Sequence, residues 1–361
     1  MKVMILSGNT GGGHFSCAKT IKEEFALRGI PCEIYDALRF APLPVAWIIS
    51  NWHNIMYRFL PKINRKFYAY ETGYLESRGI SPLYELLFRI GARALAKKIK
   101  SENINTVICT HSFAAYMLTK AIKDHGTSVR SAYVATDYTR EGIVKYTDLD
   151  YYFIPSELLA DEFICENIPR EKVIGSGIPV AKDFYAPRER KTDNGAGGKV
   201  LIAGGSAGCG PIKKLVFELA KTVPEDTQIA IVCGNNKSLY RSLKRNGKDP
   251  RIAAYGYVDN MAELMRDCDV FITKPGGIST TEAAASETPT ILYDLVQGCE
   301  SFNYDFFVRR GAACPSASID EVVEKVSVLL ESAGEREQLI ANMSKIRIED
   351  SAKKIVDCFI S

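Results

Sequence analysis

Several patterns that assign a chain quickly are missing from this sequence of 361 residues. Its ten cysteines include no Cys-x-x-Cys pair, which excludes a disulfide framework or zinc ligand set and favours a reducing compartment. Neither the Gly-x-Gly-x-x-Gly dinucleotide fingerprint nor the Gly-x-x-x-x-Gly-Lys-Ser/Thr phosphate loop occurs. The formal net charge is only +3, so nothing global indicates nucleic acid.

Long apolar runs are also missing. The longest, from Phe40 to Ile49, covers about half of the ~20 residues that a spanning helix requires and contains Pro42 and Pro44. The apolar start of the chain stops at Ser7, so no secretory signal is expected. We expect a protein that is soluble or at most attached to a membrane surface.

Two glycine-rich turns stand out among the features that are present. Residues 2–7 form an apolar run of strand length before Gly8-Asn-Thr-Gly-Gly-Gly-His14, and residues 199–203 precede Gly204-Gly-Ser-Ala-Gly-Cys-Gly210 in the same way. A strand, a glycine turn and a helix N-terminus together present N–H groups and a positive dipole end to an anion. Two such units half a chain apart predict two nucleotide-binding-type α/β domains that face a cleft.

Strand-like and helix-like segments alternate in both halves, which predicts parallel sheets covered by helices. The expected strands of the first half are 32–35, 106–110, 131–135 and 151–154, and its helices 15–28, 83–100 and 113–123. Those of the second half are the strands 200–203, 229–233, 253–257, 270–273 and 290–293, followed by a helical end over 335–360. With 186–198 as a polar linker, we predict domains at 1–185 and 199–345 and a C-terminal helix at 346–361.

His14 ends the first turn, where a helix is expected to begin. The dipole of that helix disfavours a charged imidazole, so the ring would be neutral and able to accept a proton. A capping or packing histidine is the alternative. Because the chain has only four histidines and this one adjoins three glycines, we favour a functional role.

The stretch 273–282 is the most specific, and it reads Thr-Lys-Pro-Gly-Gly-Ile-Ser-Thr-Thr-Glu. Ser279 and Thr280 are expected to cap a helix whose first turn holds Glu282. A carboxylate there can accept hydrogen bonds from both hydroxyls of a ribose, while the backbone amides at the N-terminus of the helix face a diphosphate. A capping box between Ser279 and Glu282 explains part of the pattern, but not the paired glycines beside Lys274.

Two Asp-x-Asp matches, at 148–150 and 267–269, could hold a metal under a diphosphate. Each stands before an apolar strand, whereas ligands of open α/β sheets bind at the carboxyl edge of the strands. We therefore expect no metal.

The segment 40–68 combines aromatic and basic residues, which suits a water–lipid interface. A helix pair packed on the domain core explains the segment equally well, so both interpretations stay open. The residues that would face the membrane are Trp47, Trp52, Arg58, Lys62, Arg65 and Lys66.

Taken together, the motifs resemble the monogalactosyldiacylglycerol synthase and processive diacylglycerol glucosyltransferase family, in glycosyltransferase family 28. More distantly, the chain resembles the bacterial UDP-N-acetylglucosamine transferase of peptidoglycan lipid synthesis. The resemblance covers nearly the whole chain and rests on 11–14, 110–111, 136–138, 177–179, 204–212, 233–237, 256–261 and 272–282.

The resemblance implies a GT-B fold of two Rossmann-like domains, with the C-terminal helix crossing back to the first. It implies an acceptor domain over 1–185, a UDP-sugar donor domain over 199–345, and inverting transfer of glucose or galactose to diacylglycerol or a related glycolipid. We expect no metal or other cofactor and no nucleic acid. A cytoplasmic protein at the inner face of the cell membrane, on an anionic lipid surface, is expected.

From its place at the helix start, we expect His14 to be the catalytic base, with Asp137 a second candidate for the base or an orienting partner, beside an acceptor loop of Gly11, Gly12, Gly13 and His111. The resemblance assigns the roles in donor binding. The loop 204–210 and Thr280 would hold the diphosphate, Glu282 the ribose, Tyr257 and Val258 the uracil, and Glu300 and Asn303 the hexose. The donor-binding set is Gly204, Gly205, Ser206, Gly208, Gly210, Asn235, Tyr257, Val258, Lys274, Gly276, Gly277, Ser279, Thr280, Glu282, Glu300 and Asn303.

Two places depart from the family's pattern. Asn9 replaces an aspartate in the first turn, and residues 298–303 read Gly-Cys-Glu-Ser-Phe-Asn in place of Gly-Gln-Glu-Glu-Gly-Asn. Cys299 removes a strong amide donor and acceptor and Phe302 adds bulk, so the identity of the sugar stays open. The alternatives are an N-acetylglucosamine-type transferase to another lipid acceptor, a UDP-sugar epimerase, and a non-catalytic UDP-sugar-binding regulator.

Overall fold

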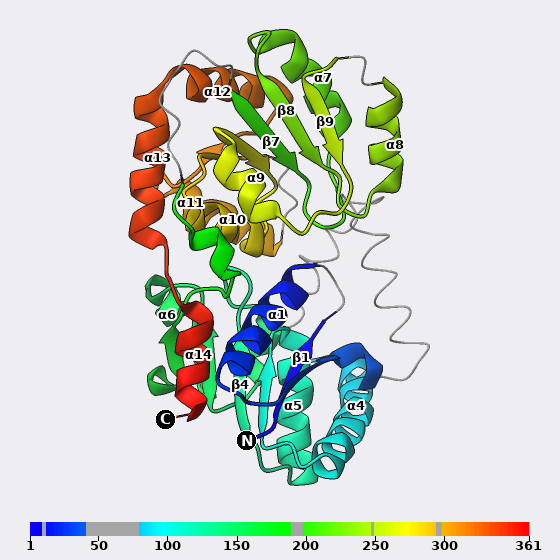
Figure 1. Cartoon of the computed structure of the whole chain (residues 1–361). Helices are drawn as coiled ribbons and strands as arrows, with labels where there is room; N and C mark the ends of the chain where they lie inside the picture. Colours follow the sequence, from blue (N-terminus) through cyan, green and yellow to red (C-terminus); the bar gives the residue numbers. More distant parts are fainter. Residues whose placement is uncertain (9–11, 41–78, 189–197, 247–248, 294–297, 361) are drawn as a thin grey trace. The chain divides into compact units, whose positions relative to one another are not determined.

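The computed structural model describes residues 1–8, 12–40, 79–188, 198–246, 249–293 and 298–360. The chain forms two compact units (Figure 1), of which unit 1 comprises Met1–Pro179 with Asp350–Ser361 and unit 2 comprises Val180–Glu349. The aromatic and basic segment with Trp47 and Trp52 lies outside the described residues, as do Asn9 and Gly11.

Unit 1 is built on a parallel sheet of six strands. Their order is β2 (Cys32–Asp36), β1 (Val3–Ser7), β3 (Thr106–Cys109), β4 (Arg130–Val134), β5 (Tyr151–Ile154) and β6 (Val173–Gly175). Every residue of β1 and β3 is buried, as expected of central strands that are covered on both faces.

The helices of unit 1 connect these strands. They are α1 (Gly12–Leu27), α4 (Pro82–Ser101), α5 (Ser112–His125), α6 (Ala160–Phe163) and α14 (Ser351–Ile360), with 3-10 turns η1 (Ala37–Phe40), η2 (Gly142–Tyr146), η3 (Glu157–Leu159) and η4 (Arg170–Lys172). α14 packs on α1, where Arg28 Nη1 lies 2.9 Å from Asp357 Oδ1. The C-terminal helix therefore belongs to unit 1, as the resemblance implied.

Unit 2 repeats the architecture with another parallel sheet of six strands. Their order is β12 (Cys314–Pro315), β11 (Thr290–Leu292), β10 (Val270–Thr273), β7 (Lys199–Ala203), β8 (Gln228–Val232) and β9 (Ile252–Tyr255). The other elements are η5 (Lys182–Tyr185), α7 (Ile212–Thr222), α8 (Lys237–Asn246), α9 (Met261–Asp267), α10 (Gly277–Ala285), α11 (Cys299–Val308), α12 (Ile319–Glu331) and α13 (Ala333–Ile346). Two apolar clusters form its core, one against α7 and α12 and the other against α9 and α10.

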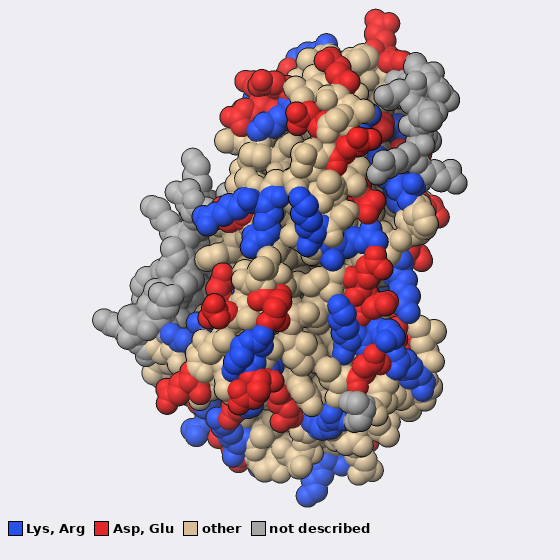
Figure 2. Space-filling view, turned by 90° about the vertical axis from the view of Figure 1, so that its left-hand side faces the viewer, with Lys and Arg blue, Asp and Glu red and all other residues tan. Residues whose placement is uncertain are grey.

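The predicted α/β class with two parallel sheets is confirmed. The single helical end over 335–360 is wrong, because α13 and α14 are separate helices that belong to different units. The break follows Arg347, and Asp350 adopts a left-handed backbone with φ 57°. On the face drawn in Figure 2, acidic and basic side chains are interspersed, as the balanced composition predicts.

In each sheet the strand order reverses once. The chain runs from β1 to β2 on one side and returns to β3 on the other, and in unit 2 it runs from β7 to β9 and returns to β10. Ligands of open α/β sheets bind outside the carboxyl ends of the strands at such switch points. Two candidate sites follow, one for each unit.

Candidate functional site

The loop after β7 is shaped for close approach to an anion. Its backbone has positive φ at Gly205, Gly208 and Gly210. A Cβ on Gly208 would lie 2.1 Å from the carbonyl oxygen of Cys233, so no other residue fits there without moving the backbone. The loop is further fixed by Asn236, whose Nδ2 donates to the Gly208 carbonyl at 2.8 Å.

Asn235 and Ser206, both in the predicted donor-binding set, contact each other at this loop through their backbones. The N–H of Asn235 donates to the carbonyl of Ser206 over 2.8 Å. Tyr257 follows β9 and is 65% exposed, while the neighbouring Val258 packs against the apolar cluster of α9 and α10. Tyr257 and Val258 therefore lie past the carboxyl end of β9, in the sheet that carries the glycine loop.

Lys274 follows β10 and contacts the glycine loop that follows β7. A Cβ on Gly205 would be 3.0 Å from Lys274 Cε, so the lysine stem lies against the glycine loop. Its Nζ is 2.7 Å from Glu300 Oε1 of α11, and both side chains are largely buried. A partly buried cation beside a turn of backbone amides suits a diphosphate.

Asn303 is fully buried in α11, and its Nδ2 donates to the Pro275 carbonyl at 3.0 Å. Together with the Glu300 contact, this fastens α11 to the Lys274–Gly276 turn. The two residues that the resemblance assigned to the hexose are thus engaged with the turn after β10.

The expected cap of α10 is wrong. Gly276 is the N-cap and makes no side-chain capping bond, so Ser279 and Thr280 lie inside the helix. The Thr280 hydroxyl donates to the carbonyls of Gly276 and Gly277 at 3.0 and 3.1 Å. Glu282 is consequently in the second turn, and a capping box with Ser279 does not form.

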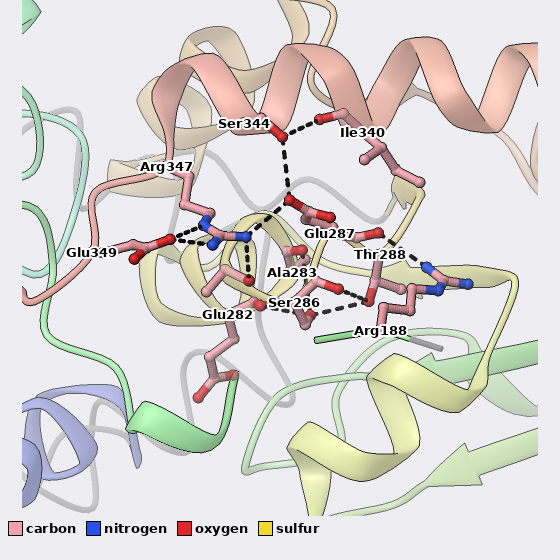
Figure 3. Close-up of polar contacts among 11 residues, drawn as sticks. Arg188, Glu282, Ala283, Ser286, Glu287, Thr288, Ile340, Ser344, Arg347 and Glu349 are labelled. Atoms are coloured by element: carbon pink, nitrogen blue, oxygen red, sulfur yellow. Dashed lines mark hydrogen bonds and ion pairs between the residues drawn. The ribbon is translucent and has the colours of Figure 1, made fainter. Parts of the chain in front are cut away.

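Glu282 is half-buried, and burial raises the pKa of its carboxyl to about 8. Figure 3 shows its side chain pointing away from the polar cluster at the end of α10, with no contact to the residues drawn. A carboxyl group with a strongly shifted pKa is the kind of group that concentrates at functional sites. When ionised, the Glu282 carboxylate can accept hydrogen bonds from the hydroxyl groups of a ligand.

The cluster at the end of α10 holds that helix in place (Figure 3). Arg347 Nη1 lies 2.9 Å from Glu287 Oε1 and 3.3 Å from the Ala285 carbonyl. Arg188 Nη1 donates to the Glu287 carbonyl at 3.0 Å, and Ser344 Oγ donates to the Glu287 carboxylate. These bonds fix the carboxyl end of α10 and leave its N-terminal end for a ligand.

In unit 1, His14 lies in the first turn of α1, at the carboxyl edge of the sheet. Its Nδ1 is 2.7 Å from the Thr110 carbonyl oxygen and 3.0 Å from Thr136 Oγ1. A carbonyl only accepts, so Nδ1 carries the proton in this contact, and in the neutral form of the ring Nε2 is the acceptor. This is the tautomer that a general base requires.

His111 caps α5, where its Nδ1 accepts from the Phe113 N–H at 3.2 Å. Its ring is buried and lies 4.6 Å from the His14 ring, centroid to centroid. A Cβ on Gly8 would be 2.2 Å from His111 Cδ2, so only glycine allows this approach. His111 thus supports His14 by packing, while Gly12 and Gly13 open α1 beside it.

Glu141 is a residue that the sequence analysis missed. Ser112 Oγ donates to its Oε2 at 2.6 Å and Tyr133 OH to its Oε1 at 3.4 Å. Burial and the nearby charge of Asp137 raise the pKa of Glu141, while His14 opposes that rise. Asp137 follows Thr136 at the same edge, but the hydrogen bonds that orient His14 come from Thr110 and Thr136.

The Asp-x-Asp carboxylates are engaged at the opposite edges of the sheets. Asp150 accepts from the N–H and hydroxyl of Ser131, and Asp269 accepts from the Lys199 N–H. Asp148 pairs with two lysines. Within the described ranges, no three His, Cys, Asp or Glu side chains gather as a metal site.

Comparisons with known proteins agree with this geometry. Residues 14–180 match the monogalactosyldiacylglycerol (MGDG) synthase family, and residues 213–346 match the glycosyl transferases group 1 family. A processive diacylglycerol beta-glucosyltransferase of Bacillus cytotoxicus is 30% identical over 99% of this chain and 93% of its own length. A relative with the same name from Bacillus cereus is 30% identical over 100% and 93%. The chain belongs to the diacylglycerol glycosyltransferase family.

Solved structures identify the fold of this glycosyltransferase as GT-B. MurG of Acinetobacter baumannii has a TM-score of 0.65 at 12% identity, with 99% of each chain covered. Anabaena Alr3699/HepE in complex with UDP and glucose has a TM-score of 0.58 at 12% identity, with 100% of each chain covered. Among the described helices, none is both long and apolar enough to cross a lipid bilayer.

Proposed function

We propose that this enzyme transfers a hexose, with inversion, from a UDP-sugar to diacylglycerol or a related glycolipid at a membrane surface. The observation that carries the proposal is the orientation of His14, because the Thr110 carbonyl accepts from Nδ1 and so directs the acceptor role to Nε2. Support for the acceptor comes from full-length relatives named diacylglycerol glucosyltransferases. Support for the donor comes from the glycine loop and Lys274 of unit 2, and from UDP in a solved structure of the same fold.

The proposed reaction is a direct displacement. Nε2 of His14 takes the proton of the acceptor hydroxyl as its oxygen forms a bond to the anomeric carbon of the sugar. The bond from that carbon to the diphosphate oxygen breaks, and UDP leaves with the electron pair. Backbone amides of 204–210 and the Lys274 cation stabilise the charge that develops on the diphosphate. No metal takes part in this proposal.

Replacement of the base tests the proposal. General-base assistance is worth ~10²–10⁴-fold, so His14→Ala should lower the turnover by that factor and leave the affinity for UDP nearly intact. His125→Ala is the matched control, since His125 is exposed at the end of α5. Unchanged turnover of the His14 variant with purified lipid would remove His14 from the mechanism.

A donor screen by mass spectrometry separates the alternatives. Conversion of a UDP-sugar without acceptor identifies an epimerase, and binding without turnover on any acceptor identifies a regulator. Transfer of N-acetylglucosamine to another lipid identifies an N-acetylglucosamine-type transferase. We expect glucose or galactose on diacylglycerol.

A location at the inner face of the cell membrane, in the cytoplasm, is part of the proposal. The segment with Trp47, Trp52, Arg58, Lys62, Arg65 and Lys66 is a candidate for contact with anionic lipid, at about 1 kcal/mol for each basic residue near the surface. Replacement of its four cations by Gln should weaken sedimentation with anionic liposomes at low salt. Unchanged sedimentation would favour core packing for this segment.

A further inference from the structure

Helix α8 of unit 2 carries an exposed stripe of cations. Lys237, Arg241, Lys244 and Arg245 are all exposed and follow one another at intervals of four, three and one. These positions share one side of an α-helix. The opposite side is apolar, with Leu243 buried and Leu239 and Tyr240 packed against the core of unit 2.

Helix α7 extends this cationic surface. Lys213 and Lys214 are exposed in its first turn. A hollow of about 520 Å³ is lined from both helices, by Lys213, Lys214, Phe217 and Glu218 on α7 and Leu239 on α8. We call the surface formed by Lys213, Lys214, Lys237, Arg241, Lys244 and Arg245 the α7–α8 basic face.

Acidic groups do not neutralise this surface. The two helices hold seven Lys and Arg against one Glu, although the whole chain carries only +3. That one acid, Glu218, already holds Lys221 at 3.0 Å through both oxygens. Among the residues that the structure describes, no Asp or Glu oxygen lies within 4 Å of the six cations, in contrast to the interspersed charges of Figure 2.

Two aromatic rings lie beneath the cations. Lys213 Nζ is 6.0 Å from the centre of the Phe217 ring, and Lys244 Nζ is 5.3 Å from that of Tyr240. Both rings are half-buried. Half-buried aromatics with lysines that extend past them are typical of surfaces that contact the headgroup layer of a bilayer.

We propose that the α7–α8 basic face docks on an anionic lipid surface. The inference rests on the proposed function, since an enzyme that uses a membrane lipid must approach the bilayer. Anionic lipid attracts basic side chains within about a Debye length, so a face with several unneutralised cations partitions to it. A donor unit bound in this way would hold the UDP-sugar loop close to the membrane, independently of residues 41–78.

Vesicle sedimentation tests the proposal. The variant Lys237→Gln, Arg241→Gln, Lys244→Gln, Arg245→Gln retains helix-forming side chains and removes four charges. On vesicles of phosphatidylglycerol and phosphatidylcholine at about 50 mM salt, we expect at least about a tenfold lower partition coefficient than that of the parent. The parent should be released at about 500 mM salt and should not bind phosphatidylcholine alone.

The matched control is Arg93→Gln, Lys97→Gln, Lys100→Gln, Lys354→Gln, which removes four exposed charges from unit 1. It should partition like the parent. An α8 variant that sediments as well as the parent overturns the proposal, and so does an equal loss in both variants. Preference of the parent for duplex DNA over anionic vesicles at equal charge would assign the face to nucleic acid instead.

Two further measurements separate this proposal from the proposed function. The α8 variant should bind UDP like the parent and transfer sugar at the parental rate to a short-chain diacylglycerol in detergent, while its transfer on vesicles falls with its binding. If the parent transfers no sugar to any acceptor, but sediments with anionic vesicles while the α8 variant does not, the proposed function fails and the docking surface stands.

Discussion

We expect the affinity for the proposed donor to depend on pH, because the pKa of Glu282 is raised. The carboxyl has a pKa of about 8 in the free protein, because burial disfavours its charged form. In the proposed donor complex, ribose hydroxyls would donate hydrogen bonds to the Glu282 carboxylate and lower its pKa. Binding therefore releases a proton, and the affinity should rise with pH until the carboxyl is ionised in the free protein as well.

The size of this effect follows from the pKa. With a value of about 8, about 3% of the carboxyl is ionised at about pH 6.5 and about 76% at about pH 8.5. The affinity should increase about 25-fold over this range, which corresponds to roughly 2 kcal/mol. UDP-glucose is the suitable ligand, since its diphosphate has no second ionisation near pH 6.

Calorimetric titration at several pH values measures this slope. Glu282→Gln should bind with an affinity that does not change with pH, and Glu282→Ala should lose roughly 1.5–3 kcal/mol of binding at high pH. Glu263→Gln removes an exposed carboxylate of the same unit and should retain the slope. A parental affinity that stays constant between these pH values would refute the assignment of Glu282 to the ribose.

Three other outcomes follow from the structure. The pKa of Glu282 is higher in the folded than in the unfolded protein, so this residue lowers the free energy of unfolding by an amount that grows from about pH 4.5 to about pH 8. Glu282→Gln should therefore raise the melting temperature at pH 8 and leave it unchanged at pH 4. Gly208→Ala should weaken UDP binding and lower the unfolding free energy by more than about 1 kcal/mol, since its Cβ would meet the Cys233 carbonyl; an unaffected variant would show that the loop conformation is dispensable. Asn303→Ala should lower the free energy of unfolding by about 1–3 kcal/mol, because the Pro275 carbonyl loses its hydrogen-bond donor. Asn303→Asp should not restore the stability, because a carboxylate cannot donate; denaturant titration measures both variants.

The sheets were accessible from the sequence because their strands are short apolar runs followed by glycine or polar turns. Val3–Ser7 and Lys199–Ala203 are central in parallel sheets, where burial on both faces requires such runs. The position of His14 followed from the same pattern, since a βα turn places its last residue at a helix N-terminus. The two-residue strand Cys314–Pro315 has too little pattern to be recognised.

Residues whose role depends on tertiary packing were not accessible in this way. Glu141 has no motif of its own, and only its burial beside Ser112 and Tyr133 marks it. Asn303 matched a family segment, but its bond to Pro275 depends on where α11 packs. The start of α10 was placed wrongly because a serine two residues inside a helix has the same local sequence as a cap.

The two switch points use one architecture for two kinds of chemistry. In unit 2, the loop after β7 has positive φ at three glycines, and the partly buried Lys274 lies beside it, so the proposed function gives this loop the diphosphate, whose charge grows during the reaction. In unit 1, the Gly8 backbone instead makes room for a histidine ring, and that ring packs against His14. The Thr110 carbonyl then fixes which nitrogen of His14 is basic. Backbone amides cannot remove a proton, and packed imidazoles do not provide the amide donors that a diphosphate needs. In the proposed function, unit 2 would therefore stabilise the leaving group and unit 1 would accept the proton.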